Sequence, residues 1–111
     1  MRRSDLPDED LMSEYQDGSE EAFRILYDRH SGKIFGFLKS RTRSDQFASD
    51  LAQEVFIKIH KSKHLYNRSL PVLPWIFSIT NSVMIDGLRK EGRKREILDL
   101  DLDQYSSPTE E

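Results

Sequence analysis

The sequence predicts an all-α protein, a compact bundle of about four helices with a disordered acidic tail, and three observations support this fold class. Through most of residues 8–95 apolar side chains recur at spacings of three and four, which is the period of an amphipathic helix. No segment alternates polar and apolar residues for long enough to predict a strand. The chain has 111 residues, a length that suits one small domain and excludes a two-domain enzyme.

The first two helices are expected on either side of an Asp-Gly pair at residues 17 and 18. A short apolar stripe that begins at Leu11 stops at this pair. Ser19 then suits the cap of the second helix, because a serine hydroxyl accepts a hydrogen bond from an otherwise unpaired backbone N–H. One face of that helix is expected to be buried, at least in part, and consists of Phe23, Leu26, Tyr27, His30, Ile34, Phe37 and Leu38.

A third helix is predicted to begin at Ser44 or Asp45 and to have two different faces. The face expected to pack in the core consists of Phe47, Ala48, Leu51, Ala52, Val55, Phe56 and Ile59. At about 100° per residue, the opposite arc is left free of the core. It consists of Asp50, Gln53, Glu54, Ile57 and Lys61.

Residues 62–73 lack a clean period and include a proline, so they predict a loop of about ten residues, and loops of this length in a small domain are usually functional. Pro74 suits the first turn of a fourth helix, because its missing N–H would have no helical partner there. That helix is expected to end near Arg95. We expect residues 1–7 to be flexible and the acidic residues 96–111 to form a disordered tail or linker.

Charge is distributed unevenly along the chain, although the formal net charge is only -3. Residues 1–30 have four basic and nine acidic side chains, residues 31–95 have thirteen and five, and residues 96–111 have none and six. A positive surface confined to the middle of a chain is typical of a protein that binds a polyanion. Ordinary solvated helix faces are the alternative explanation, and charge taken alone favours that explanation.

The chain contains no cysteine, which excludes disulfides, thiolate chemistry and zinc sites built on cysteine. No apolar run approaches the roughly 18 residues needed to cross a bilayer. The N-terminus also turns acidic after Arg3, where a signal peptide would turn apolar. We therefore expect a cytoplasmic protein with no membrane insertion.

Two segments contain the side-chain types that bind nucleic acid. The last turns of the fourth helix concentrate five cations, which are Arg89, Lys90, Arg93, Lys94 and Arg95. Their interaction with the helix dipole explains this cluster only in part. The preceding loop combines an aromatic ring, an amide and a cation, in Tyr66, Asn67 and Arg68. Aromatic faces beside cations suit single-stranded nucleic acid, because each stacked base contributes about 1–3 kcal/mol.

The sequence predicts neither an enzyme nor a cofactor. Its carboxylates are concentrated at helix starts and in the tail, where capping and solubility explain them. His60 and His64 are spaced to present two nitrogens from one helix face, but no third metal ligand is evident. The pattern therefore favours two surface histidines over a zinc site in a small metal-dependent enzyme.

Two longer motifs follow each other in the chain, DLAQEVFIKIH at residues 50–60 and, after a variable loop, WIFSITNSVMIDGLRK at residues 75–90. Taken in their order and spacing, they resemble region 2 of the bacterial sigma-70 initiation factors. The pattern DGSEEAF at residues 17–23 is most similar to the extracytoplasmic-function (ECF) group. The resemblance covers about residues 8–95 and is more specific than any one of these motifs.

The resemblance implies a domain that docks on the clamp-helix coiled coil of the RNA polymerase beta-prime subunit. The residues implied in this contact are Asp50, Gln53 and Glu54. Carboxylate and amide groups are suitable partners for arginine, whose planar fork binds a carboxylate with two hydrogen bonds. An anti-sigma factor, whose helices would cover the same polar face, is a second partner to consider.

The resemblance also implies that the domain recognises and melts the promoter minus-ten element, capturing a flipped base of the non-template strand. The segment implied in base capture consists of Tyr66, Asn67 and Arg68, and the helix implied to lie along the DNA contributes Arg89, Lys90, Arg93 and Lys94. Such a role is binding without covalent chemistry. Trp75 is assigned equally to the core and to DNA. Ser78 and Ser82 replace an arginine and an asparagine common in the family, so neither is assigned a DNA contact.

A second function stays open at this point. ECF factors usually continue into another helical domain that binds the minus-35 element, whereas this sequence ends in what resembles the linker. The alternative is a stand-alone or truncated interaction module that binds core polymerase or an anti-sigma factor without melting DNA.

Overall fold

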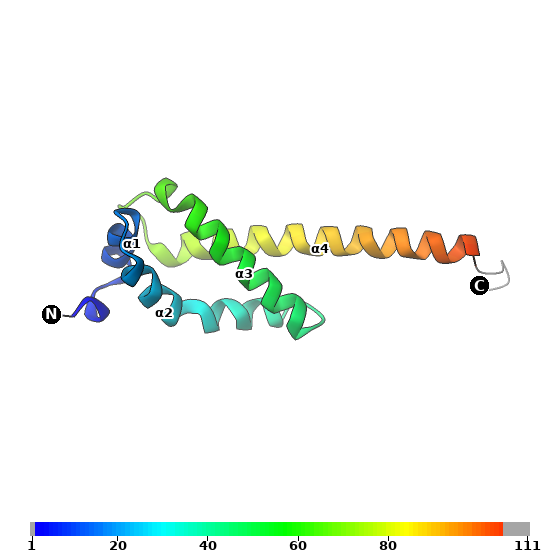
Figure 1. Cartoon of the computed structure of the whole chain (residues 1–111), viewed down its shortest axis with the longest axis horizontal. Coiled ribbons are helices and arrows are strands. Elements are labelled where there is room, and N and C mark those ends of the chain that lie inside the picture. Colours follow the sequence, from blue (N-terminus) through cyan, green and yellow to red (C-terminus); the bar gives the residue numbers. More distant parts are fainter. Residues whose placement is uncertain (1, 106–111) are drawn as a thin grey trace.

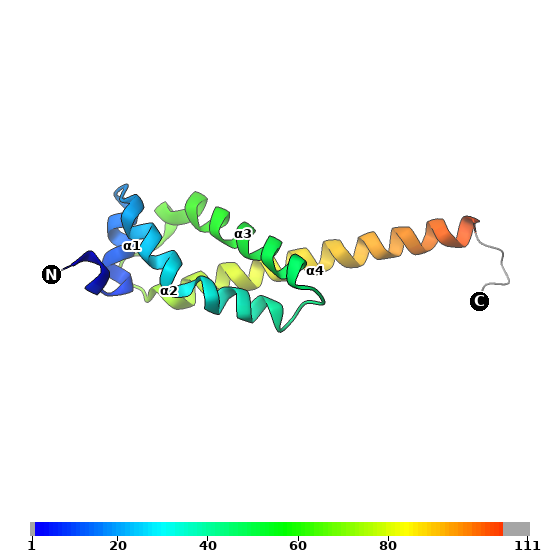
Figure 2. The same cartoon turned by 60° about the horizontal axis from the view of Figure 1, so that its bottom comes forward.

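The computed structural model describes the backbone of residues 2–105 and the side chains of residues 2–94. Its elements are a 3-10 helix η1 (Arg3–Asp5), then α1 (Asp8–Gln16), α2 (Glu20–Lys39), α3 (Asp45–Ser62), a 3-10 helix η2 (Lys63–Leu65) and α4 (Val72–Tyr105) (Figure 1). This described part contains no strand, which confirms the all-α fold class. The first three helices pack around the N-terminal part of α4, and α4 then continues past them (Figure 2).

The helix starts lie where the capping residues predicted them. The Ser19 hydroxyl accepts a hydrogen bond from the backbone N–H of Ala22 at 3.1 Å, and the Ser44 hydroxyl accepts one from Phe47 at 3.0 Å. A cap of this kind typically stabilises a helix by about 1 kcal/mol. Between α1 and α2, Gly18 has a φ of 108°, a backbone conformation that side chains with a Cβ rarely adopt.

One apolar core joins the four helices. Its fully or almost fully buried members are Leu11, Met12, Tyr15, Ala22, Leu26, Ile34, Leu38, Ala48, Leu51, Val55, Ile59, Tyr66, Val72, Ile76, Val83 and Met84. His30 is also buried, at 4% exposed, as its place in the apolar face of α2 predicted. Its Nε2 is hydrogen bonded to Asp8 Oδ2 at 2.8 Å, and Arg29 donates to the other oxygen of the same carboxylate at 2.9 Å.

The segment before α1 is tied to the bundle by charge. Arg3 forms ion pairs with Glu14 on α1 and Glu21 on α2, each at 2.5 Å. Arg29 also donates a hydrogen bond to the carbonyl of Ser4 at 2.7 Å. All these contacts are at the surface, where ion pairs contribute little net stability. They involve residues 1–7, the stretch that the sequence predicted to be flexible.

Helices α3 and α4 are in close contact at Gly87. A Cβ placed on Gly87 would lie 2.6 Å from Cδ2 of Leu51, a distance that real Cβ contacts essentially never show. Leu51 is buried, so its side chain has little room to move away. The absence of a side chain at residue 87 therefore allows the two helices to pack directly against each other.

Two boundaries differ from the sequence prediction. The connection from α3 to α4 is shorter than the expected ten-residue loop, because η2 extends α3 and leaves only residues 66–71 without helix. Helix α4 also continues past Arg95 to Tyr105. No proline occurs in α4 after Pro74, and leucine, glutamate and isoleucine beyond Arg95 favour helix. Of the predicted disordered tail, residues 106–111 lie outside the described residues.

The Gly87 contact generates a prediction about stability. We expect Gly87→Ala to lower the free energy of unfolding by about 1 kcal/mol, because the cost of overpacking exceeds the gain in helix propensity. Gly92→Ala is the matched control, since Gly92 lies on the same helix with nothing within 4 Å of its added Cβ. It should stabilise the protein by up to about 1 kcal/mol. Urea unfolding followed by circular dichroism measures both changes, and two changes of the same sign would refute the close contact.

Candidate protein and nucleic-acid interfaces

The three residues assigned to protein docking share the exposed face of α3. Asp50, Gln53 and Glu54 are all exposed, as the helical period predicted. Gln46, one turn earlier, donates a hydrogen bond to Asp50 Oδ1 at 2.9 Å. Among the described residues neither Asp50 nor Glu54 forms an ion pair, so both carboxylates are available to a cationic partner.

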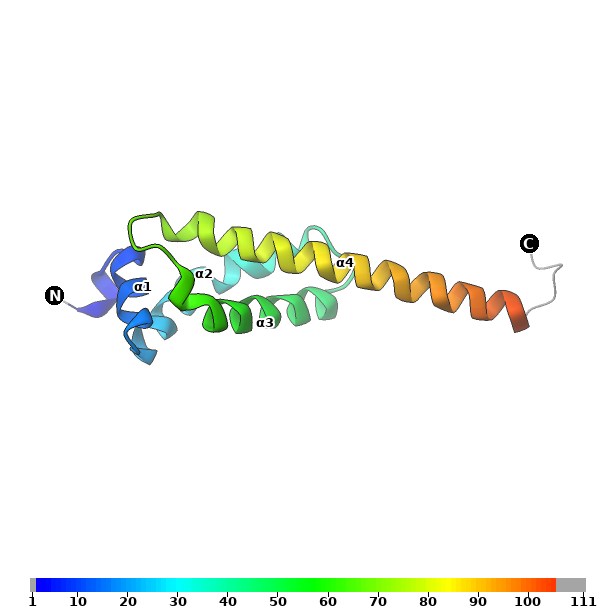
Figure 3. The same ribbon diagram turned by 90° about the horizontal axis from the view of Figure 1, so that it is seen from above.

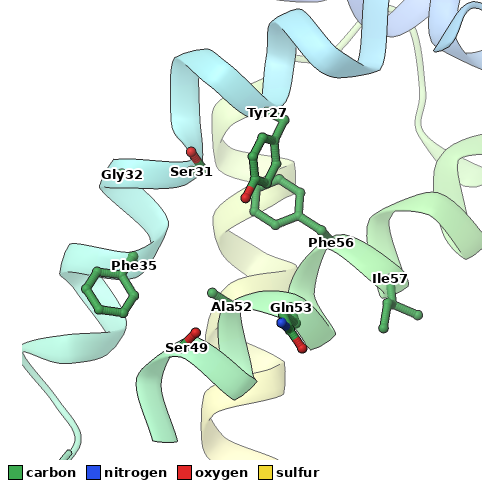
Figure 4. Close-up of a pocket in the computed structure, with 9 residues that line it drawn as sticks. All are labelled: Tyr27, Ser31, Gly32, Phe35, Ser49, Ala52, Gln53, Phe56 and Ile57. Atoms are coloured by element: carbon green, nitrogen blue, oxygen red, sulfur yellow. The ribbon is translucent and has the colours of Figure 1, made fainter. Parts of the chain in front are cut away.

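A groove between α2 and α3 adjoins this polar face (Figure 4). It encloses about 530 Å³ and is lined by Tyr27, Ser31, Gly32, Phe35, Ser49, Ala52, Gln53, Phe56 and Ile57. Ile57 is 54% exposed and Tyr27 is 43% exposed, so two large side chains of the groove are open to solvent. The Tyr27 and Phe56 rings meet edge to face at one end of the groove, with centroids 4.7 Å apart. Gln53 thus connects a polar face to an apolar groove.

The groove is a feature that sequence reasoning missed. Tyr27 lies on the apolar face predicted for α2, and the period of that face alone assigns such a residue to the core. Phe35 does not belong to that face. In the structure the crossing of α2 over α3 leaves these rings at the border between the two helices, where solvent reaches them. Whether a residue lies at this border or in the core depends on how the two helices are placed relative to each other.

The cations assigned to nucleic acid lie along α4. Arg89, Lys90, Arg93 and Lys94 are all exposed, and the side chain of Arg95 lies outside the described residues. Arg89 forms an exposed ion pair with Asp86 at 3.5 Å, which is too weak to prevent a phosphate from competing for the guanidinium. Lys90 and Lys94 also share a hollow of about 390 Å³ with Asp50 and Glu54, so the two candidate interfaces adjoin.

Tyr66 differs from the sequence expectation of an aromatic face open to a base. Tyr66 is only 3% exposed, and the centroid of its ring lies 5.3 Å from the ring centroid of Trp75. Trp75 is itself partly buried. The Tyr66 hydroxyl donates a hydrogen bond to the carbonyl of Leu70, which closes the loop on itself. Burial, and then the negative charge of Glu9, raise the pKa of Tyr66 above its ordinary value. The short connection between η2 and α4 explains this burial, because it draws Tyr66 back against the core.

The neighbouring Asn67 and Arg68 are exposed but already have protein partners. Asn67 Oδ1 accepts hydrogen bonds from the backbone and the hydroxyl of Ser69, at 2.9 and 2.7 Å. Arg68 donates three hydrogen bonds, to Gln16 Oε1 at 2.5 Å and Ser13 Oγ at 2.7 Å on α1, and to Asp17 Oδ1 at 2.8 Å directly after this helix. The loop is therefore bound to α1 at the end of the bundle where the two lie together (Figure 3).

Sequence reasoning missed these residues of α1 entirely. Gln16 alone makes three contacts with the loop, since its amide also donates to the carbonyls of Lys63 and Tyr66 at 2.8 Å. Glu9 accepts a hydrogen bond at 2.9 Å from the backbone N–H of Val72, at the start of α4. These partners are about fifty or more residues apart in the chain, so no local pattern links them.

The two histidines weighed as metal ligands do not lie in a metal-binding cluster. In the part of the chain that the structure describes, no three His, Asp or Glu side chains are grouped to hold an ion. His60 Nδ1 lies 2.6 Å from the hydroxyl of Tyr15. Burial raises the pKa of Tyr15 to about 12, so the phenol keeps its proton at neutral pH in this contact with His60. None of the described helices is apolar over a long enough stretch to span a membrane.

The chain matches the family model described as Sigma-70 region 2 over residues 26–94. The RNA polymerase sigma factor CarQ of Myxococcus xanthus is 31% identical over 80 residues, which cover 72% of this chain and 46% of CarQ. The ECF RNA polymerase sigma factor RpoE of Cereibacter sphaeroides is 35% identical over 83 residues, covering 73% of this chain and 46% of RpoE. The ECF RNA polymerase sigma factor SigX of Bacillus subtilis is 32% identical over 77 residues, covering 69% and 40%.

The chain thus spans less than half the length of these relatives. The match to the family model includes α3, the loop and the described side chains of α4. No solved structure matches the chain.

Proposed function

Since the chain belongs to the sigma-70 region 2 family, as a relative of the ECF sigma factors, we propose that it binds core RNA polymerase and opens promoter DNA at the minus-ten element during transcription initiation. The observation that most supports this proposal is the uninterrupted family match over residues 26–94, which includes both candidate interfaces. The protein would act in the cytoplasm, by binding alone and without a cofactor or a catalytic step.

The proposed docking surface is the exposed face of α3 together with the groove beside it. Asp50 and Glu54 supply free carboxylates, Gln53 supplies an amide, and Ile57 supplies an exposed apolar side chain next to them. A helical partner with arginine and apolar side chains on one face fits this combination, because charged groups orient a contact while apolar groups stabilise it. The clamp helices of the beta-prime subunit are the proposed partner.

The proposed DNA surface runs along α4 and ends at the loop. Arg89, Lys90, Arg93 and Lys94 would neutralise phosphates of the promoter. Tyr66, Asn67 and Arg68 would hold a flipped base of the non-template strand once the loop has opened, with Trp75 beneath them. Unstacking a base costs a few kcal/mol, which stacking and hydrogen bonds in the pocket would offset.

A second candidate function is an interaction module that binds core polymerase or an anti-sigma factor without melting DNA. The burial of Tyr66 favours it, because a ring packed against Trp75 offers no face to a base. Ser78 and Ser82, at positions where the family commonly has arginine and asparagine, favour it as well. The two functions share the α3 surface and differ in the loop and α4.

The docking surface predicts the effect of a double variant. We expect Gln53→Ala/Glu54→Ala to weaken binding to core RNA polymerase at least about tenfold, because truncating one partner of a buried, hydrogen-bonded charge pair at an interface costs about 2–5 kcal/mol. Surface plasmon resonance with immobilised core enzyme measures the affinity. Asp10→Ala, which removes an exposed carboxylate from α1, is the control and should bind like the wild type. Equal affinity of the double variant and the control would refute docking through α3.

The DNA surface predicts a change in salt dependence. Arg93→Ala/Lys94→Ala should weaken binding to single-stranded DNA and make the slope of log K against log salt shallower by about 1.4, since each phosphate contact contributes about 0.7 for single strands. Fluorescence anisotropy at several salt concentrations measures this slope. Lys33→Ala, an exposed cation of α2, should leave it nearly unchanged. An unaltered slope in the double variant would favour the second candidate function.

A further inference from the structure

The connection between α3 and α4 is held in a closed state by α1. Arg68 donates three hydrogen bonds, to Ser13 and Gln16 of α1 and to Asp17 directly after this helix, so three of the five guanidinium donors are engaged. Gln16 adds hydrogen bonds to the carbonyls of Lys63 and Tyr66, on both sides of the bend between η2 and the loop. Tyr66 and Arg68 are therefore both anchored at the C-terminal end of α1.

The closed state hides the groups that base capture would use. Tyr66 lies with its ring against Trp75 and its hydroxyl on the Leu70 carbonyl, and only 3% of it is exposed. A base cannot stack on this ring until the loop moves. Arg68 likewise cannot donate all its N–H groups to a phosphate while Ser13, Gln16 and Asp17 accept hydrogen bonds from it.

We propose that Ser13 and Gln16 of α1, together with Asp17 directly after it, form an autoinhibitory latch, which keeps the Tyr66–Arg68 loop closed and limits its affinity for unpaired DNA. This inference rests on the proposed function of the loop in base capture. Opening would be reversible, because Arg68 exchanges one set of partners for another. It is bound to α1 when the loop is closed and to a phosphate when the loop is open. The affinity for DNA then depends on the fraction of molecules in which the loop is open.

The Arg68 guanidinium is expected to bind a phosphate more strongly than it binds its carboxylate partner in the latch. Among the side chains that the structure describes, Asp17 is the only carboxylate paired with Arg68 in the closed state, and both side chains are more than half exposed. An exposed ion pair of this kind contributes little in water, whereas a guanidinium binds phosphate with two parallel hydrogen bonds. Single-stranded DNA placed beside the loop would therefore compete effectively for Arg68. The loop would remain closed in the absence of DNA and open on contact with it.

The test uses variants on the α1 side, so that Tyr66 and Arg68 stay intact. Ser13→Ala/Gln16→Ala removes neutral groups and leaves the net charge unchanged, and Ser13→Ala alone is a milder form should the double variant fold poorly. Gln46→Ala is the matched control, because the amide of Gln46 bonds Asp50 on α3 and not the loop. Circular dichroism verifies that each variant is folded.

Two readouts separate the latch from the function of the loop. Trp75 is the only tryptophan in the chain, so its fluorescence reports directly on the contact with Tyr66. Anisotropy with an adenine- and thymine-rich single strand of about 15 nucleotides, and with the same sequence as a duplex, measures DNA affinity. We expect the double variant to shift Trp75 emission to longer wavelength and to bind the single strand about fivefold more tightly, with little change on the duplex.

Each other result overturns a defined part of the proposal. Trp75 emission unchanged from the wild type in both α1 variants would overturn the latch itself. A shifted emission with unchanged or weaker binding to the single strand would overturn base capture by this loop, and the inhibitory role with it. An equal gain on single strand and duplex would also overturn the inhibitory role, because opening the loop should favour unpaired bases only.

Discussion

Gly87 allows α4 to lie directly against Leu51 of α3, and the placement of both candidate interfaces depends on this contact. With the apolar side of α3 pressed onto α4, the polar side of α3 faces outward with Asp50, Gln53 and Glu54. The same packing brings the exposed lysines of α4 next to those carboxylates around a shared hollow. A bulkier residue at position 87 would separate the helices and change the geometry of both surfaces at once.

The proximity of the two surfaces has a physical consequence. Asp50 and Glu54 lie near Lys90 and Lys94 without forming an ion pair among the described residues, so the carboxylates offset only part of the positive potential of the lysines. A partner that covers the carboxylates would remove negative potential from beside the lysines, and DNA phosphates would then be attracted more strongly. Docking and DNA binding are therefore expected to favour each other through charge alone, without a change in conformation.

The second organising element is α1, the shortest of the four helices. Its nine residues contribute Leu11, Met12 and Tyr15 to the core, while its polar side holds both the start of α4 and the loop before it. Glu9 satisfies the Val72 N–H, one of the backbone groups that a helix start leaves unpaired. A helix that fixes both ends of a short connection is well placed to control how that connection moves.

Much of this structure could be predicted from local sequence patterns. Ser19 and Ser44 cap the helices that they were expected to cap, and the free arc of α3 follows directly from its helical period. Patterns of this kind report on one helix at a time, so they correctly separated the two faces of α3. They also assigned His30 to the interior, where it is paired with Asp8.

Features that arise between helices could not be predicted in this way. The α2–α3 groove depends on the angle at which two amphipathic helices cross, and Tyr27 looks like a core residue in sequence. The contacts of Arg68 and Gln16 join residues about fifty positions apart, and nothing in either segment signals the other. Tyr66 was expected to be accessible because its segment lacks a helical period. In the structure it is buried, with its ring near Trp75 and its hydroxyl bonded to the Leu70 carbonyl.

The most direct test of the account is hydroxyl-radical footprinting of the chain bound to core RNA polymerase. Ile57 and Tyr27, exposed side chains on the two walls of the α2–α3 groove, should lose reactivity in the complex. Leu65 and Leu70, which are exposed on η2 and in the loop, should keep theirs when no DNA is present. Unchanged reactivity of Ile57 and Tyr27, together with protection of Leu65 and Leu70, would contradict docking through α3 and place the polymerase contact at the other end of the molecule.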